Sequence, residues 1–274
     1  MAEKGPTDTS KEECAAQPTD PGNGSDTGDD GGATTSPPPV SVSKFMMSNK
    51  TESTMWLLRL FTLISTFFFL FPVFGIAEGG QFYQRALLAN ALTSSFRLHQ
   101  RLPRFQFSRA YLTQALLEDS CHYLLYSLIF ITSYPITLCL VPVAVFSLLH
   151  ATAYTRKILN IIGPNSMPWL RSFLDKMTMH QQSLFKFIAC NEILLMPASV
   201  FTLLGGRAHL FLPFFYYRFL TLRYGSRRNP YCRTLFYELR VAIEHMTERP
   251  SCPTFIRNTC HKTMRLIGKL APSS

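Results

Sequence analysis

Apolar residues along the chain are concentrated in three long segments that polar stretches separate. The central segment, residues 123–149, runs for 27 residues without an Asp, Glu, Lys or Arg. The other two cover about residues 56–77 and 184–204. A helix needs roughly 20 apolar residues to cross the hydrocarbon core of a bilayer, whereas a surface helix of a soluble domain keeps one polar face. The pattern therefore predicts an all-α, polytopic helical membrane protein.

Two prolines, Pro135 and Pro142, interrupt the central segment. Proline removes a backbone donor and disfavours helical geometry in the residue before it, so two shapes stay open. One is a single long, kinked span. The other is a hairpin in which a helix over about residues 109–132 turns at residues 133–135 and a second helix returns to about residue 155. If that turn lies inside the bilayer, we expect the hairpin to act as a wedge in one leaflet.

Shorter segments with helical periodicity lie between and after these runs. Residues 81–102 have a broad apolar face, which favours an interfacial helix, with packing against the membrane bundle as the alternative. A short helix is expected from Pro168. Residues 209–222 are aromatic but too short for a full span, which favours a half-buried or interfacial helix.

Charge is distributed unevenly along the chain. Residues 1–55 carry four Lys and nine Asp or Glu, whereas residues 205–274 carry twelve Lys or Arg and three Glu. Residues 1–44 are rich in Gly, Pro, Ser, Thr and Asp, which predicts a disordered acidic tail. A basic segment beside hydrophobic spans is typical of the cytosolic side. The predicted domains are this tail, a helical membrane domain over residues 45–222 and a cytosolic basic tail over residues 223–274.

The basic tail contains two amphipathic helices that Pro250 and Pro253 separate. An apolar stripe opposite a Lys- and Arg-rich face is typical of a helix lying in the headgroup plane; the alternative is a charged face over an internal core. Membrane lipids are the expected partner, and nucleic acid is not, since no nucleic-acid module accompanies the charge. The residues predicted to bind the membrane surface are Leu239, Ile243, Ile256, Arg257, Lys262, Met264, Arg265 and Lys269.

Two topologies agree with this charge distribution. Three spans place the amino end in the lumen, whereas a four-span arrangement with the central hairpin places both ends in the cytosol. The positive-inside rule favours the second. Both topologies place the carboxyl tail in the cytosol.

Polar residues at membrane depth are the candidates for a functional site. Glu192 lies inside the third segment, where a carboxylate is costly and is therefore a functional hypothesis; the structural alternative is that Asn191 or an Arg from a neighbouring helix satisfies it and holds the bundle in register. Glu118 and His122 share a helix face at i and i+4 and supply too few ligands for a metal site. The chain contains no familiar catalytic motif. We therefore predict a non-enzymatic protein without metal or cofactor.

Several blocks of sequence resemble the transmembrane protein 33 family, among them FMMSNKTESTMWLLRLFT, FYQRALLANALTSSFRLHQRLPRF, KFIACNEILLMPA and YYRFLTLRYGSRRNPYCRTLF. The resemblance covers about residues 45–272 and excludes the acidic leader. It implies a multi-pass protein of the endoplasmic reticulum membrane and nuclear envelope. It also implies association with reticulons, influence on the tubular network, a link to the unfolded-protein response and, from fungal relatives, association with nuclear pores. The family is described with three spans.

The resulting expectation is a protein that binds other membrane proteins, of the reticulon type, and regulates membrane organisation. The alternative is a transporter, a channel-regulating subunit or a lipid-moving protein that uses the intramembrane Glu192.

Overall fold

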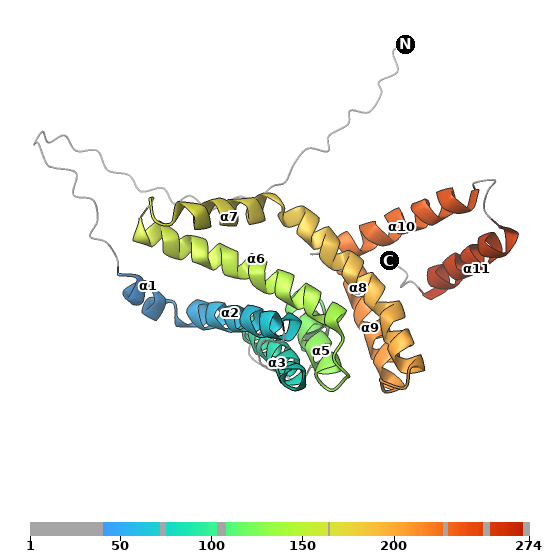
Figure 1. The fold of residues 1–274 in the computed structure, drawn as a ribbon, viewed down its shortest axis with the longest axis horizontal. Coiled ribbons are helices and arrows are strands. Elements are labelled where there is room, and N and C mark those ends of the chain that lie inside the picture. Colours follow the sequence, from blue (N-terminus) through green and yellow to red (C-terminus); the bar gives the residue numbers. More distant parts are fainter. Residues whose placement is uncertain are drawn as a thin grey trace, which may run out of the picture. The chain divides into compact units, whose positions relative to one another are not determined.

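The computed structural model describes residues 41–71, 75–102, 108–163, 165–226, 230–248 and 253–270. Within these residues every regular element is an α-helix, which confirms the predicted all-α class. The helices, labelled in Figure 1, are α1 (Val42–Ser48), α2 (Lys50–Leu70), α3 (Ile76–Arg101), α4 (Arg109–Leu116), α5 (Asp119–Ile131), α6 (Thr137–Ile162), α7 (Pro168–Met179), α8 (Gln181–Leu204), α9 (Phe211–Gly225), α10 (Tyr231–Glu248) and α11 (Thr254–Leu270).

Three of these helices, α2, α6 and α8, are long and apolar enough to cross a membrane. The distribution of exposed and buried residues on α2 also indicates a membrane helix. Leu57, Phe61 and Ile64 of α2 are exposed, whereas Thr62 and Ser65 are buried. A helix of a water-soluble protein turns its apolar stripe inward, so this inverted pattern fits a helix whose outer face contacts lipid.

The first membrane helix differs in its bounds from the expected segment of residues 56–77. It begins earlier, at Lys50, and ends at Leu70, while Ile76 and Ala77 already belong to α3. Hydropathy marks the apolar part of a helix and misses polar turns that continue it, which explains the early start. Of the expected disordered tail over residues 1–44, residues 1–40 lie outside the described part, and residues 42–44 form the first turn of α1.

The central hydrophobic segment forms a hairpin and not a single kinked span. α5 ends at Ile131 and α6 begins at Thr137, so the break falls at residues 132–136, beside Pro135. Pro142 is accommodated inside α6. The helix expected over residues 109–132 is itself divided into α4 and α5, because the backbone of Glu118 is extended.

Three pairs of helices that follow each other in the chain can be distinguished: α2 with α3, α5 with α6, and α8 with α9; α5 itself packs chiefly against α3 and α9. The Tyr126 hydroxyl donates to the Cys139 carbonyl at 2.8 Å across the second pair. The Tyr216 hydroxyl donates to the Glu192 carbonyl at 2.7 Å across the third pair. The turns of the second and third pairs lie together, since the Arg207 guanidinium lies 5.6 Å from the centre of the Tyr134 ring.

The opposite ends of these pairs also converge. The start of α2 contacts the end of α6, where the hydroxyls of Ser53 and Tyr154 are 2.7 Å apart. The ring of Phe185 at the start of α8 lies 5.5 Å from that of Tyr231 at the start of α10. The start of α2 and the start of the basic tail therefore lie on the same side of the helix bundle.

Aromatic side chains form the core between α5 and α9. The rings of Tyr126 and Phe130 on α5 pack against those of Tyr216 and Phe219 on α9, with centroids 5.0 Å apart for Tyr126 and Phe219. Such rings bury large areas in favourable tilted arrangements. α3 joins this core through buried Tyr83, so the segment expected over residues 81–102 is a helix packed against the bundle.

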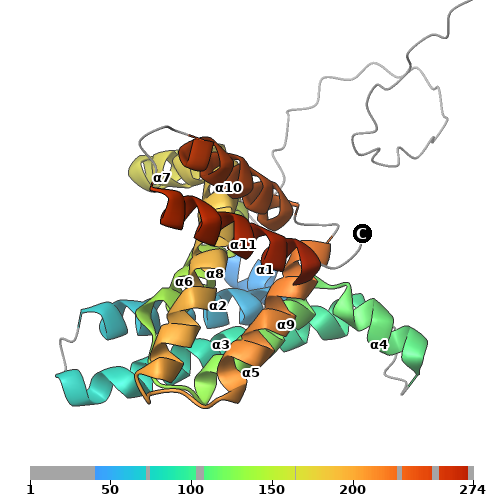
Figure 2. The ribbon, with the colours of Figure 1, turned by 90° about the vertical axis from the view of Figure 1, so that its right-hand side faces the viewer.

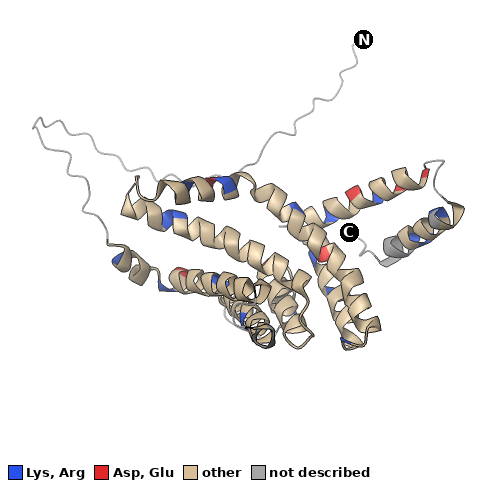
Figure 3. Ribbon diagram, viewed as in Figure 1, with Lys and Arg blue, Asp and Glu red and all other residues tan. Residues whose placement is uncertain are grey.

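The two amphipathic helices of the tail are present as α10 and α11, and α11 folds back beside α10 (Figure 1 and Figure 2). The first turns of α10 pack on the bundle, where Cys232 is buried against Ala189 and Leu220. The short helix expected from Pro168 is α7, with the proline in its first turn, where a missing N–H costs nothing. In Figure 3, the lengths of α6 and α9 are largely uncharged, whereas Lys and Arg recur along α10 and α11.

Candidate functional site

The buried carboxylate of Glu192 lies in the middle of α8 and is fully enclosed. Arg223, near the end of α9, donates from Nε to the Glu192 Oε2 at 3.1 Å. The hydroxyl of Tyr123, on α5, donates to the Glu192 Oε1. Glu192 therefore joins three helices that the chain order separates, and its charge is balanced by Arg223.

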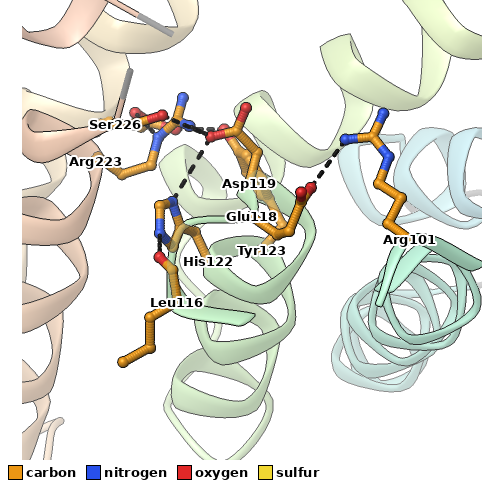
Figure 4. Close-up of polar contacts among 9 residues, drawn as sticks. Arg101, Leu116, Glu118, Asp119, His122, Tyr123, Arg223 and Ser226 are labelled. Atoms are coloured by element: carbon orange, nitrogen blue, oxygen red, sulfur yellow. Dashed lines mark hydrogen bonds and ion pairs between the residues drawn. The ribbon is translucent and has the colours of Figure 1, made fainter. Parts of the chain in front are cut away.

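Arg223 is the centre of this arrangement and is itself 1% exposed. Its Nη1 lies 3.1 Å from the Asp119 Oδ1, which also accepts a hydrogen bond of 3.0 Å from the Ser226 hydroxyl (Figure 4). Its guanidinium lies 5.2 Å from the centre of the Tyr123 ring. Burial by itself would lower the pKa of Arg223, but the carboxylates of Glu192 and Asp119 raise it above its ordinary value. The cation is therefore permanent and holds both carboxylates.

Glu118 and His122 do not form a common site. Glu118 precedes α5 and forms an ion pair with Arg101 at 3.0 Å, whereas the His122 Nε2 donates to the Leu116 carbonyl at 2.7 Å (Figure 4). The His122 Nδ1 faces Asp119 at 3.8 Å. Burial lowers the pKa of His122, so the imidazole is neutral at pH 7. Among the described residues no group of three His, Cys, Asp or Glu side chains is placed to hold a metal ion.

The ion pairs and hydrogen bonds of this cluster connect neighbouring helices to one another. Each carboxylate has a cationic partner, and the hydroxyls of Tyr123 and Ser226 satisfy further oxygen lone pairs. We expect this buried ion pair to fix the register of the helices that carry it. Proton transport by Glu192 would first require the carboxylate to leave Arg223.

The basic tail presents the other candidate surface. Leu239 and Met246 of α10 are exposed, Ile243 and Met264 are half-buried, and Lys262 and Arg265 are exposed. Arg257 instead has an internal contact, since its Nε donates to the Thr247 carbonyl at 3.0 Å and ties α11 to α10. The side chains of Ile256 and Lys269 lie outside the described residues.

Comparison with known proteins identifies the family. A family model described as Transmembrane protein 33/Nucleoporin POM33 matches residues 35–273. The chain belongs to this family. It is 62% identical to mouse Transmembrane protein 33 over 230 residues, which are 84% of this chain and 93% of the relative. The human Transmembrane protein 33 is 61% identical over the same coverage. Krueppel homolog 2 of Drosophila melanogaster is 37% identical over 238 residues, 86% of each chain. No solved structure matches.

Membership of the Transmembrane protein 33/Nucleoporin POM33 family confirms the resemblance drawn from the quoted sequence blocks. The name describes membrane proteins, in agreement with the three helices long enough to span. It names no enzyme class.

Sequence reasoning missed Arg223 as the residue that neutralises Glu192. The sequence placed it at the start of the basic tail, whereas the structure buries it in the bundle. One signal was present: Arg223 follows the aromatic run at residues 211–219 at helical spacing, on the face of Tyr216 and Phe219. A cation on the buried face of a helix needs a carboxylate partner, and Glu192 was the intramembrane carboxylate.

Proposed function

We propose that this member of the Transmembrane protein 33/Nucleoporin POM33 family is a non-catalytic protein of the endoplasmic reticulum membrane and nuclear envelope. In this role it binds other membrane proteins, such as reticulons, and regulates the organisation of tubular membrane. A link to the unfolded-protein response follows from the same resemblance. The nucleoporin in the family description supports an association with nuclear pores.

The observation that carries this proposal is the combination of exposed apolar and cationic side chains on α10 and α11. Leu239 is 43% exposed and Met246 is 65% exposed. Lys262 and Arg265 are also exposed. Apolar side chains that are left open beside Lys and Arg favour insertion into the headgroup layer of an anionic membrane. The tail helices thereby act on one leaflet.

The central hairpin adds area to a leaflet in a second way. α5 has 13 residues, so at 1.5 Å per residue it is about 20 Å long, shorter than the roughly 30 Å hydrocarbon core. If α5 begins at the headgroups, the turn at residues 132–136 lies inside the bilayer. The hairpin then occupies one leaflet more than the other, which favours a curved membrane.

The test is flotation of a peptide over residues 230–274 with small anionic vesicles. Ile256→Glu with Met264→Glu places two carboxylates on the apolar stripe of α11. Thr254→Glu with Asn258→Glu adds the same charge to the same helix at exposed positions outside that stripe. Burial of one large apolar side chain contributes about 1.5–3 kcal/mol, so we expect the first pair to weaken binding at least about 100-fold.

The matched pair of variants separates insertion from simple charge attraction. We expect the Thr254→Glu and Asn258→Glu peptide to lose only the electrostatic part, about 1 kcal/mol per unit of charge near the surface. Equal binding by both variants would show that the apolar stripe does not enter the membrane, and the proposed mechanism would fail.

A further inference from the structure

A partly open cavity of about 250 Å³ lies between α2, α3, α5, α6 and the first residues of α8 and α10. It is on the side of the bundle where α2 and the basic tail begin. Three arginines line it, Arg59, Arg97 and Arg101, against a single carboxylate, Asp119. A water molecule takes about 30 Å³ in the liquid, so the cavity holds several waters or one larger polar group.

The carboxylates around this cavity are engaged elsewhere. Glu118 pairs with Arg101 at 3.0 Å, and Asp119 pairs with Arg223 at 3.1 Å. Glu52, which precedes Arg59 on α2, pairs with Lys157 at 3.1 Å. Neither Arg59 nor Arg97 has a carboxylate within ion-pair distance among the described residues.

Of these two arginines, Arg59 is the more deeply buried and has fewer polar contacts. It lies in a helix long enough to span a membrane, is 8% exposed and forms no hydrogen bond or ion pair with any residue that the structure describes. The Nη1 of Arg97 lies 2.7 Å from the Nε2 of His150. Since a guanidinium only donates, this nitrogen of His150 is the acceptor and supplies no negative charge. Arg59 and Arg97 therefore line one cavity with no carboxylate in direct contact with either, an arrangement that is costly for the buried Arg59.

Much of the remaining polar lining consists of hydroxyl groups, beside the amide of Asn90 and the imidazole of His150. Ser94 on α3, Ser120 on α5 and Ser147 on α6 are buried and line the cavity. None of their hydroxyls makes a hydrogen bond within the described part of the chain. A group that matches this lining carries negative charge and several acceptor oxygens. Phosphate has both properties and suits the planar fork of arginine.

We propose that this cavity binds a phosphate group, with Arg59 and Arg97 as its charge partners and the hydroxyls of Ser94 and Ser147 as donors. The group belongs either to a lipid headgroup or to free phosphate. The lipid source fits a cavity that the membrane helices α2, α6 and α8 line. This inference is independent of the proposed action of the tail on membrane shape.

The experiment measures thermal unfolding of the purified, delipidated full chain in a neutral detergent. The ligands are dioctanoyl phosphatidic acid, dioctanoylglycerol as the matched lipid without phosphate, and inorganic phosphate. A ligand that binds only the folded protein raises Tm with its concentration. We expect phosphatidic acid to raise Tm saturably and dioctanoylglycerol to leave it unchanged. Stabilisation by inorganic phosphate alone assigns the site to the free ion.

Variants then locate the binding. Arg59→Gln and Arg97→Gln are each expected to raise the apparent Kd about ten-fold or more, since each removes charge-assisted hydrogen bonds. Arg85→Gln is the control, an exposed arginine on α3 away from the cavity, and we expect it to bind as the unmodified chain does. Arg59→Lys keeps the charge and is expected to retain part of the affinity.

The Tm without ligand distinguishes a loss of phosphate binding from a loss of folding. Without ligand, Arg59→Gln removes an unpaired buried cation, so its Tm is expected to equal or exceed that of the unmodified chain. The Ser94→Ala and Ser147→Ala double variant, which keeps both charges, is expected to weaken phosphate binding without changing the ligand-free Tm by more than a few degrees. Equal stabilisation of the unmodified chain, Arg59→Gln and Arg97→Gln by phosphatidic acid would overturn the proposal. So would the absence of any response to either phosphate compound.

Discussion

Removing Arg223 should destabilise the bundle more than removing any exposed cation. Arg223→Gln leaves the carboxylate of Glu192 fully enclosed, with the Tyr123 hydroxyl as its remaining side-chain partner. Breaking a buried ion pair from one side costs about 3–5 kcal/mol. For a chain of this size about 1 kcal/mol corresponds to a shift of roughly 2–4 °C, so Tm should fall by at least about 6 °C.

The assay is thermal unfolding of purified protein in detergent, with two comparisons. Lys186→Gln breaks an ion pair with Glu238 in which both side chains are about half exposed, so its cost should stay below about 1 kcal/mol. Glu192→Gln combined with Arg223→Gln removes both buried charges, and this double variant should unfold at a higher temperature than Arg223→Gln alone. Refutation takes either of two forms: a Tm for Arg223→Gln no lower than that of Lys186→Gln, or a double variant that loses the sum of the two single losses.

Two further predictions concern α5. Because burial lowers the pKa of His122 from 6.5, the unfolded chain binds this proton more readily than the folded protein, and stability should fall as pH drops through about 6.5. His122→Gln keeps a donor for the Leu116 carbonyl but cannot titrate, so its Tm should change less between pH 7.5 and 5.5; an unchanged pH dependence would contradict this. Tyr126→Phe removes the hydrogen bond to the Cys139 carbonyl and should cost about 1–3 kcal/mol, measured by the same unfolding assay against Tyr237→Phe on an exposed residue as control. A Tyr126→Phe variant as stable as that control would show that the hairpin does not depend on this contact.

The positions of most helices follow from the sequence because apolar periodicity and prolines are local signals. The break beside Pro135, the start of α7 at Pro168 and the two amphipathic tail helices are examples. The bounds of α2 were harder to predict from the sequence, because residues 50–55 are polar and continue the helix without a hydropathic signal. Periodicity also left both the single span and the hairpin open, because it does not specify which helices pack together.

The partners of the buried polar residues depend on that packing. Inside a membrane the lipid-facing side of a helix is apolar, so the polar residues of α2 and α3 mark the faces that meet. The sequence showed that Glu192 is costly at its depth, but its pairing with Arg223 requires α8 and α9 to be antiparallel with a particular register. The cavity at Arg59 and Arg97 likewise joins helices that are distant along the chain.

The start of α2 and the start of the basic tail lie on one side of the bundle, and we propose that this side faces the cytosol. The most direct measurement is protease protection of full-length protein in intact microsomes, with one epitope tag before Met1 and another after Ser274. We predict that protease removes both tags without detergent, while the membrane helices stay protected and resist extraction by carbonate. Protection of the carboxyl-terminal tag until detergent is added would place the basic tail in the lumen and contradict the account.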